Sequence, residues 1–288
     1  MAESALVRLW SGAASVLIRF WFDRRRPPVG APGRIACVSS ARDTADPLAP
    51  LVELPGVADA VARARDAVAK AHAHPANRRG WPATAAEASV RAARASAALD
   101  GGKAELPVDG LVSDPVLAGA LRVSEELGRL LPVWRRAPLQ ALARLHVLAA
   151  TDLVPAADRA EVLGRPRAVA GVTERLELLG RLVGTSTVPA PVLVAVVHGE
   201  LLAVSPFEQA NGVVARAAAR LTGLSTGLDP KGLAVPEVGH LRKAREYADA
   251  AAGFVTGTRE GLGRWLLHCC AAWELGGREA ESIAEAAS

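Results

Sequence analysis

The stretch Val204-Ser205-Pro206-Phe207-Glu208-Gln209-Ala210-Asn211-Gly212 decides how this chain of 288 residues is organised. An apolar run at helical spacing, residues 193–203, precedes it, and a second helical run with Arg216 and Arg220 on its surface follows it. Proline, asparagine and glycine between two such runs predict a tight loop that joins two helices. Asn211-Gly212 would then turn backbone N–H groups and the positive end of the second helix dipole toward an anion.

The rest of the chain has the same helical periodicity. Helices are predicted at residues 57–74, 84–99, 115–131, 138–151, 156–163, 173–182, 189–204, 210–221, 235–256 and 258–276. Almost no segment alternates with period two, so the predicted fold class is all-α, with room for one short β-hairpin between Gly164 and Thr173. Thr84 with Glu87 three residues later predicts a capping box at the start of the second helix, and Gly101-Gly102 predict its end.

Composition divides the chain into an N-terminal extension and a folded body. Residues 5–22 are apolar at helical spacing but contain Arg8 and Arg19, which predicts an amphipathic helix and disfavours a membrane span. That helix would lie on the protein's own body, on a partner subunit or on a membrane surface. Residues 23–55, rich in Pro, Gly, Ser and Asp, predict a mostly irregular linker. We therefore expect three parts: an extension at 1–56, further helices at 57–134 and a core at 135–280.

The overall composition is that of a folded globular protein, with 50% hydrophobic and 22% charged residues. The net charge of +4 is mild, and no basic stripe alternates with aromatic residues, which disfavours nucleic acid as a partner. Cys37, Cys269 and Cys270 have neither a disulfide framework nor C-x-x-C spacing. We therefore expect a cytoplasmic protein without a structural metal, associated at most with a membrane surface.

The loop resembles the signature of the Fic (Fido) family, H-P-F-x-[DE]-G-N-G-R-x-x-R, which also follows a long apolar helix. Ala141-Leu142-Ala143-Arg144-Leu145-His146 resembles the family's early core helix. Gly164-Arg165-Pro166-Arg167 resembles its glycine-arginine turn before the flap, and residues 261–270, with Trp265, resemble its closing helix. The resemblance covers residues 138–276 and implies a helical Fic bundle.

The resemblance implies that three chemical positions have changed. In the family the loop histidine takes the proton from a target hydroxyl group, which then attacks the α-phosphate of ATP. Ser205 stands at that position, and a serine hydroxyl is not a base at neutral pH. Gln209 stands at the position of the metal-holding acid and offers Mg²⁺ no charge, so Mg²⁺ binding would be weak or absent. Val213 replaces the first arginine of the motif and removes a phosphate contact.

The same resemblance implies that a nucleotide-binding framework is retained. Phe207 matches the phenylalanine that anchors the loop in the core. Ala210, Asn211 and Gly212 match the phosphate-cradling Gly-Asn-Gly with one added methyl group, and Arg216 matches the second arginine. These residues would allow ATP to bind as a substrate or a ligand.

A second motif resembles the inhibitory helix of many Fic proteins, S-x-x-x-E-G, whose glutamate pairs with the second loop arginine. Ser96-Ala97-Ala98-Leu99-Asp100-Gly101 has this pattern with aspartate in place of glutamate. If Asp100 reaches Arg216, the pair would occupy the group that otherwise binds a γ-phosphate. The alternative is that Asp100 is only a solvated helix end.

Three functions stay open from the sequence. The first is a pseudoenzyme that binds a nucleotide or an unknown protein partner and has a regulatory role. The second is an active protein adenylyltransferase (AMPylator) or another phosphate-group transferase, with Ser205, Glu208 or His198 in unfamiliar roles. The third is an adaptor at a membrane surface or a protein, acting through residues 5–22. His198 is otherwise expected to be a packed helix residue, Glu200 a surface residue, and the Cys269-Cys270 pair part of the core.

Overall fold

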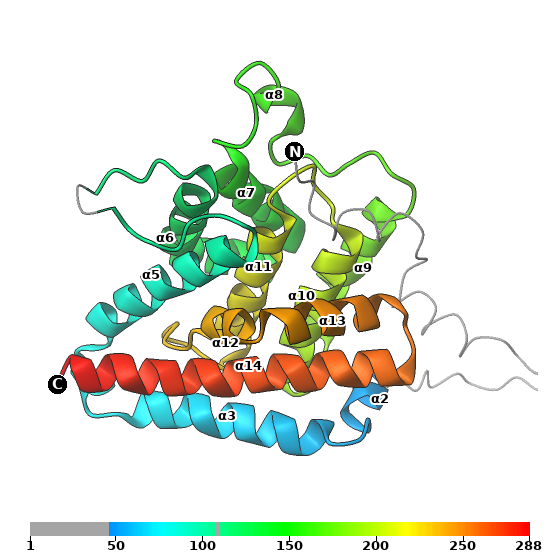
Figure 1. Ribbon diagram of the computed structural model, residues 1–288. Helices are drawn as coiled ribbons and strands as arrows, with labels where there is room; N and C mark the ends of the chain where they lie inside the picture. Colours follow the sequence, from blue (N-terminus) through cyan, green and yellow to red (C-terminus); the bar gives the residue numbers. More distant parts are fainter. Residues whose placement is uncertain (1–45, 108–109) are drawn as a thin grey trace, which may run out of the picture.

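The computed structural model describes residues 46–107 and 110–288, which form helices and connecting loops with no β-strand among them (Figure 1). The all-α prediction is therefore confirmed. The predicted helix at residues 5–22 and Cys37 lie outside the described residues. The helices are α2 (Ala49–Val52), α3 (Val57–Ala73), α4 (Ala76–Arg79), α5 (Trp81–Leu99), α6 (Pro115–Arg136), α7 (Pro138–Ala150), α8 (Arg159–Val162), α9 (Val172–Thr185), α10 (Ala190–Val204), α11 (Asn211–Thr226), α12 (Pro236–Arg242), α13 (Ala244–Val255) and α14 (Arg259–Ala286).

The central helix of the bundle is α10. Its residues from Pro191 to Leu201 are buried without interruption, as is typical of a helix that is surrounded by others. The α11 helix packs beside it, and the long α14 helix runs along α3 at one side of the bundle (Figure 1). A Cβ atom on Gly277 of α14 would lie 2.7 Å from the carbonyl carbon of Ala67. The glycine therefore lets these two helices approach closely.

Local signals at two helix starts explain where the chain enters α6 and α14. The side chain of Asp114 accepts a hydrogen bond from the backbone N–H of Leu117, and Thr258 accepts one from Gly261. Both are N-cap contacts that satisfy a free backbone donor in the first turn. The predicted capping box at Thr84 and Glu87 is wrong, because α5 begins at Trp81 and Thr84 lies within it.

Thr84 instead donates a hydrogen bond to the side chain of Asn77, at 2.6 Å, and so joins α5 to α4. Glu87 pairs with Arg91 one turn further along the helix. The sequence has the pattern of a capping box, but the hydroxyl of Thr84 donates to the buried Asn77, seven residues earlier, and does not cap a helix.

Two further predictions are corrected by the structure. Residues 235–256 form two helices, α12 and α13, because Lys243 leaves the helical conformation between them. The hairpin expected between Gly164 and Thr173 is absent from the described residues, and most of that stretch is irregular. Pro166 lacks a backbone donor, and Gly164 and Gly171 have positive φ angles, so regular strand pairing is unfavourable there.

The described end of the predicted N-terminal extension belongs to the core. Leu48, Leu51 and Leu54 are each buried against the main hydrophobic cluster. Asp46 accepts hydrogen bonds from the hydroxyl of Ser186 and the backbone N–H of Thr187, at the end of α9. These contacts fix the point where the chain enters the folded body.

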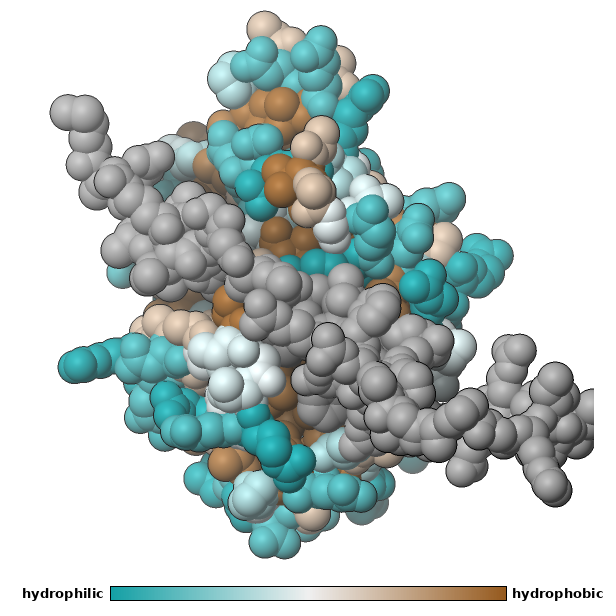
Figure 2. Space-filling model, turned by 90° about the vertical axis from the view of Figure 1, so that its right-hand side faces the viewer, coloured by the Kyte–Doolittle hydropathy of each residue, from teal (hydrophilic) through white to brown (hydrophobic). Residues whose placement is uncertain are grey.

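The surface of the described chain carries few large hydrophobic side chains. On the face shown in Figure 2, where grey residues do not cover it, hydrophobic areas lie between hydrophilic ones. In the described ranges no helix is both long and apolar enough to cross a bilayer.

Candidate functional site

The loop between α10 and α11 has a sharply turned backbone. Ser205 has φ 43° and Ala210 has φ 58°, both in the left-handed region. For a residue with a side chain this conformation costs on the order of 1–2 kcal/mol. The hydroxyl of Ser205 donates to the carbonyl of Leu202, in the last turn of α10, at 2.9 Å. The side chains of Glu208 and Gln209 are exposed.

Asn211 holds the loop closed through two hydrogen bonds. Its Oδ1 accepts from the N–H of Phe207 at 2.9 Å, and its Nδ2 donates to the carbonyl of Phe207 at 2.8 Å. Phe207 is buried and stacks on the imidazole of His146, with ring centroids 4.0 Å apart. Nδ1 of His146 accepts from the N–H of Gly164, at 2.9 Å. The loop is thus fastened both to α11 and to α7.

Arg167 fastens the loop from a third side. Its N–H donates to the carbonyl of Pro206 at 2.7 Å, and its Nε donates to that of Ser205 at 2.9 Å. Its Nη2 also donates to the carbonyl of Val204, at the end of α10, at 3.3 Å. A cation at the C-terminus of a helix is favourable because carbonyl groups are unpaired there.

Replacing Arg167 with alanine should therefore lower the free energy of unfolding by about 1.5 kcal/mol, since hydrogen bonds from a charged donor are lost. Urea unfolding measures this change. The matched control is Arg165→Ala, because Arg165 is an exposed neighbour two residues away. We expect the control to change stability by less than about 0.5 kcal/mol. Equal losses in the two variants would contradict the role given to Arg167.

The N-terminus of α11 is occupied by the carboxylate of Asp100. Its Oδ2 accepts from the backbone N–H of Val213 at 3.0 Å, and its Oδ1 accepts from Nη2 of Arg216 at 2.6 Å. A Cβ atom on Gly212 would lie 2.2 Å from Oδ1, so only glycine admits the carboxylate here. Gly101 follows with φ 82°, which turns the chain away from α5 directly after Asp100. An anion site is therefore present, and the chain's own carboxylate fills it.

Arg216 is held by several partners and only 3% exposed. Its Nε donates to Oγ of Ser96 at 2.9 Å, and its Nη2 donates to the carbonyl of Ser96 at 2.9 Å. Its Nη1 lies 3.4 Å from the hydroxyl of Tyr247. Burial alone would lower the pKa of Arg216, but the charge of Asp100 and the contact with Tyr247 outweigh it and raise that pKa. Arg216 is therefore charged at neutral pH.

Tyr247 links Arg216 to a group of buried histidines. The guanidinium can only donate, so the tyrosine oxygen accepts from it and its hydrogen is left for Nε2 of His198, 2.9 Å away. Nδ1 of His240 lies 3.0 Å from Nε2 of His268. Burial, with nearby Arg216 and His268, holds the pKa of His198 well below its ordinary value. His198 is therefore a neutral core residue that accepts from Tyr247.

Three expectations about charged residues are wrong. Arg216 and Arg220 are 3% and 4% exposed and do not lie on the surface of α11. Glu200 is fully buried in α10, where its Oε1 accepts from Nε of Arg175 at 2.7 Å. Helical spacing could not show that Glu200 is buried. The α10 helix is apolar on all sides, so any polar residue in it needs a buried partner.

An apolar pocket lies beside the loop, on the side of α7 and α9. Its volume is about 280 Å³, and Leu139, Leu142, Pro166, Leu176 and Phe207 are among its lining residues. Such a lining suits an apolar group and not a phosphate. In the described ranges, no three His, Cys, Asp or Glu side chains are grouped so that they could hold a metal ion.

Sequence reasoning missed the residues that hold Arg216 and the loop from distant parts of the chain. Tyr247 is 31 residues from Arg216, and Arg167 is 38 residues from Ser205. Arg167 had one signal, its place in the Gly164-Arg165-Pro166-Arg167 turn, but Tyr247 had none. The structure brings Ser96, Asp100, Gly212 and Arg216 together. Ser205 lies at the end of the loop that is further from α11, and Gln209 lies in the exposed middle of the loop.

Comparison with known proteins identifies the fold. No family model matches the sequence, and no curated protein matches it. Among solved structures, it is similar to a Fic family protein from Desulfovibrio desulfuricans G20, with a TM-score of 0.64 and 18% sequence identity. The match covers 79% of this chain and 74% of that one. The fold is therefore the Fic fold that the loop resemblance implied.

Proposed function

We propose that this chain, which has the fold of a Fic protein, is a regulatory binding module without ordinary adenylyl-transfer activity. The observation that carries this proposal is the carboxylate of Asp100, which is bound by Val213 N–H and Arg216 where a nucleotide phosphate would otherwise be bound. The side chain of Asp100 fills the site at the start of α11, and a phosphate-bearing ligand would have to displace that carboxylate.

The loop supports a non-catalytic role. Ser205 is not a base at neutral pH, and its hydroxyl already donates to Leu202 within the chain. Both polar atoms of the Asn211 side chain are engaged by Phe207. His198 is too deeply buried to act as a substitute base, since its Nε2 is engaged by Tyr247. Gln209 is exposed and offers Mg²⁺ a neutral oxygen only.

ATP is the ligand we propose for the open form. The nest formed by the start of α11, together with Arg216, would bind a phosphate group through backbone N–H donors and one guanidinium. Mg²⁺ would add little, because no carboxylate of the loop stands at the metal position. Opening would require that Asp100 lose two hydrogen bonds, one of them to a charged group, so a partner protein that moves the end of α5 would favour binding.

Calorimetric titration with ATP, with and without Mg²⁺, tests this proposal. The unaltered chain should bind ATP weakly, and Asp100→Ala should bind at least about 10-fold more tightly, since a charged competitor worth roughly 1.4 kcal/mol or more is removed. Arg216→Ala in the Asp100→Ala background should abolish the gain. Asp59→Ala, at an exposed position on α3, is the control and should behave as the unaltered chain does.

Two results would contradict these proposals. If Asp100→Ala stays folded and gives no heat with ATP, the nest does not bind nucleotide and ATP is not the ligand. If the unaltered chain transfers labelled AMP to protein, the alternative of an active adenylyltransferase is correct.

A further inference from the structure

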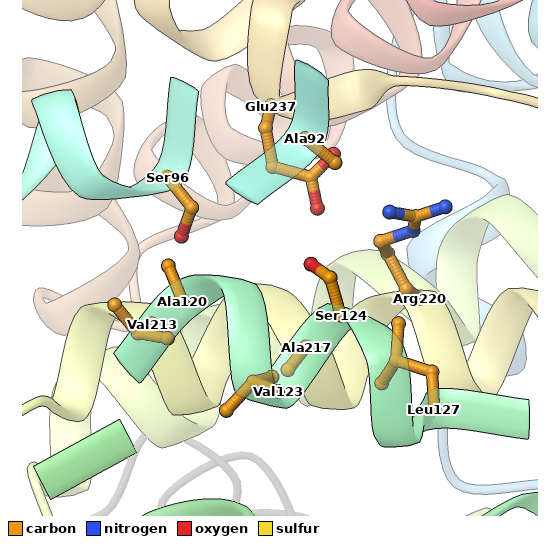
Figure 3. A pocket seen from close by; sticks show the side chains of 10 residues that line it. All are labelled: Ala92, Ser96, Ala120, Val123, Ser124, Leu127, Val213, Ala217, Arg220 and Glu237. Carbon is orange, nitrogen blue, oxygen red and sulfur yellow. The ribbon is translucent and has the colours of Figure 1, made fainter. Parts of the chain in front are cut away.

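A small polar cavity lies where α5, α6, α11 and α12 meet (Figure 3). Its volume is about 10 Å³. Four polar side chains line it, one from each helix: Ser96, Ser124, Arg220 and Glu237. In Figure 3 the polar ends of Glu237, Ser124 and Arg220 lie near one another, and the hydroxyl of Ser96 lies apart from them, on the side of Ala120. The remaining lining residues are apolar, namely Ala92, Ala120, Val123, Leu127, Val213 and Ala217.

Two buried charged side chains at this cavity each have one polar atom without a hydrogen-bond partner. Nη1 of Arg220 and Oε2 of Glu237 have no hydrogen bond, although these residues are only 4% and 3% exposed. Nη2 of Arg220 donates to the carbonyl of Gly232 at 3.2 Å, which leaves Nη1 as a spare donor. The two side chains do not form a direct ion pair within 4.0 Å. Unpaired buried charges are unfavourable, so a group that joins them is expected.

We propose that a single water molecule binds in this cavity and bridges Arg220 and Glu237. A cavity of about 10–15 Å³ holds one water, and buried waters make about three hydrogen bonds to polar groups. The water would accept from Nη1 of Arg220 and donate to Oε2 of Glu237. The hydroxyl of Ser124, which also lines the cavity, would supply the third hydrogen bond.

The bridged site would hold α12 to α11, because Glu237 belongs to α12 and Arg220 belongs to α11. Burial raises the pKa of Glu237, and the nearby charge of Arg220 opposes that shift. A bridging water carries the attraction between these groups without direct contact. The site does not depend on nucleotide binding.

A crystal structure of the unaltered chain at about 1.8 Å resolution tests the proposal directly. We expect one solvent peak within about 2.7–3.2 Å of both Arg220 Nη1 and Glu237 Oε2. A cavity without density, or a direct contact between the two side chains, would overturn the proposal.

Two substitutions at Ser124 provide a second test, because a wet and a dry cavity predict opposite signs. Ser124→Val adds methyl groups that displace the water, and Ser124→Ala leaves room for it. With a water present, valine should lower the melting temperature by about 3 °C more than alanine does. In a dry cavity valine would fill empty space and would be as stable as alanine or more stable.

The matched controls are Ser282→Val and Ser282→Ala on the exposed face of α14, which measure the helix propensity of the two residues. The difference between the Ser124 variants is read after the control difference is subtracted. Crystals of Ser124→Ala should keep the solvent peak, and crystals of Ser124→Val should lose it.

Discussion

Lowering the pH from 7 to 5 should reduce the free energy of unfolding by about 4 kcal/mol through His146 and His268 alone. Burial lowers the pKa of each of these imidazoles from 6.5 to about 4. In the unfolded chain both take up a proton as the pH falls below 6.5, whereas in the folded chain they stay neutral until about pH 4. The unfolded state therefore binds more protons in this window, and stability falls with pH.

Other groups change the size of the effect but not its sign. His198 and His240 have pKa values held well below the ordinary value by burial and by charged neighbours, so they add to the loss. Glu237 acts in the opposite direction, because burial raises its pKa and the folded state takes up that proton first. Asp46 adds to the loss at lower pH, since hydrogen bonds that outweigh its burial hold its pKa below the usual value.

Urea unfolding at pH 7, 6 and 5 measures the effect, and one variant assigns it. His268→Gln keeps an amide near the position of Nε2 and removes one titrating imidazole, so the loss between pH 7 and 5 should shrink by about 2 kcal/mol. His74→Gln, at a partly exposed histidine at the end of α3, is the matched control for the substitution itself. If the free energy of unfolding stayed constant between pH 7 and 5, these imidazoles would take up protons as readily in the folded chain as in the unfolded chain.

The fold was predictable because its main signals are local. Helical spacing identified nearly all the long helices, and the Pro-Phe…Asn-Gly loop between two apolar runs indicated which family of bundles to expect. The errors also have local causes. Helical spacing continues across Lys243, so the break between α12 and α13 left no trace in the pattern. Thr84 and Glu87 have capping-box spacing, but a tertiary contact with Asn77 decided where α5 begins.

The site was less predictable because its geometry depends on contacts across the bundle. The six-residue motif ending at Gly101 suggested that Asp100 reaches Arg216, and the structure places their atoms 2.6 Å apart. No spacing could show that the same guanidinium contacts Tyr247, or that Glu200 is buried against Arg175. Residue type alone placed Glu200, Arg216 and Arg220 on the surface, and burial among partners overrode that preference.

Restoring the altered positions should create adenylyl-transfer activity, if the Fic fold has lost only its chemical groups. The proposed variant carries Ser205→His, Gln209→Asp, Ala210→Gly and Val213→Arg together with Asp100→Gly. Histidine at position 205 would accept the proton of a target hydroxyl, whose oxygen attacks the α-phosphate while the bond to pyrophosphate breaks. Asp100→Gly empties the nest at the start of α11, and glycine at position 210 suits the positive φ of 58° found there.

Val213→Arg is the substitution most at risk, because the Val213 side chain is buried and lines the cavity of Arg220 and Glu237. Melting temperatures must therefore accompany the assay, and a second version that keeps Val213 separates misfolding from inactivity.

Transfer of label from ATP to protein is the measurement that decides between a lost and an absent active site. The restored variant should exceed the same variant with serine at position 205 by roughly 10²–10⁴-fold, which is the usual contribution of a positioned base. That serine version is the matched control, since it shares every other change. A restored variant that is folded and binds ATP but transfers no label would show that the loop geometry, held by Asn211 and Arg167, itself prevents transfer. The chain would then be a binding module by its architecture and not only by its missing histidine.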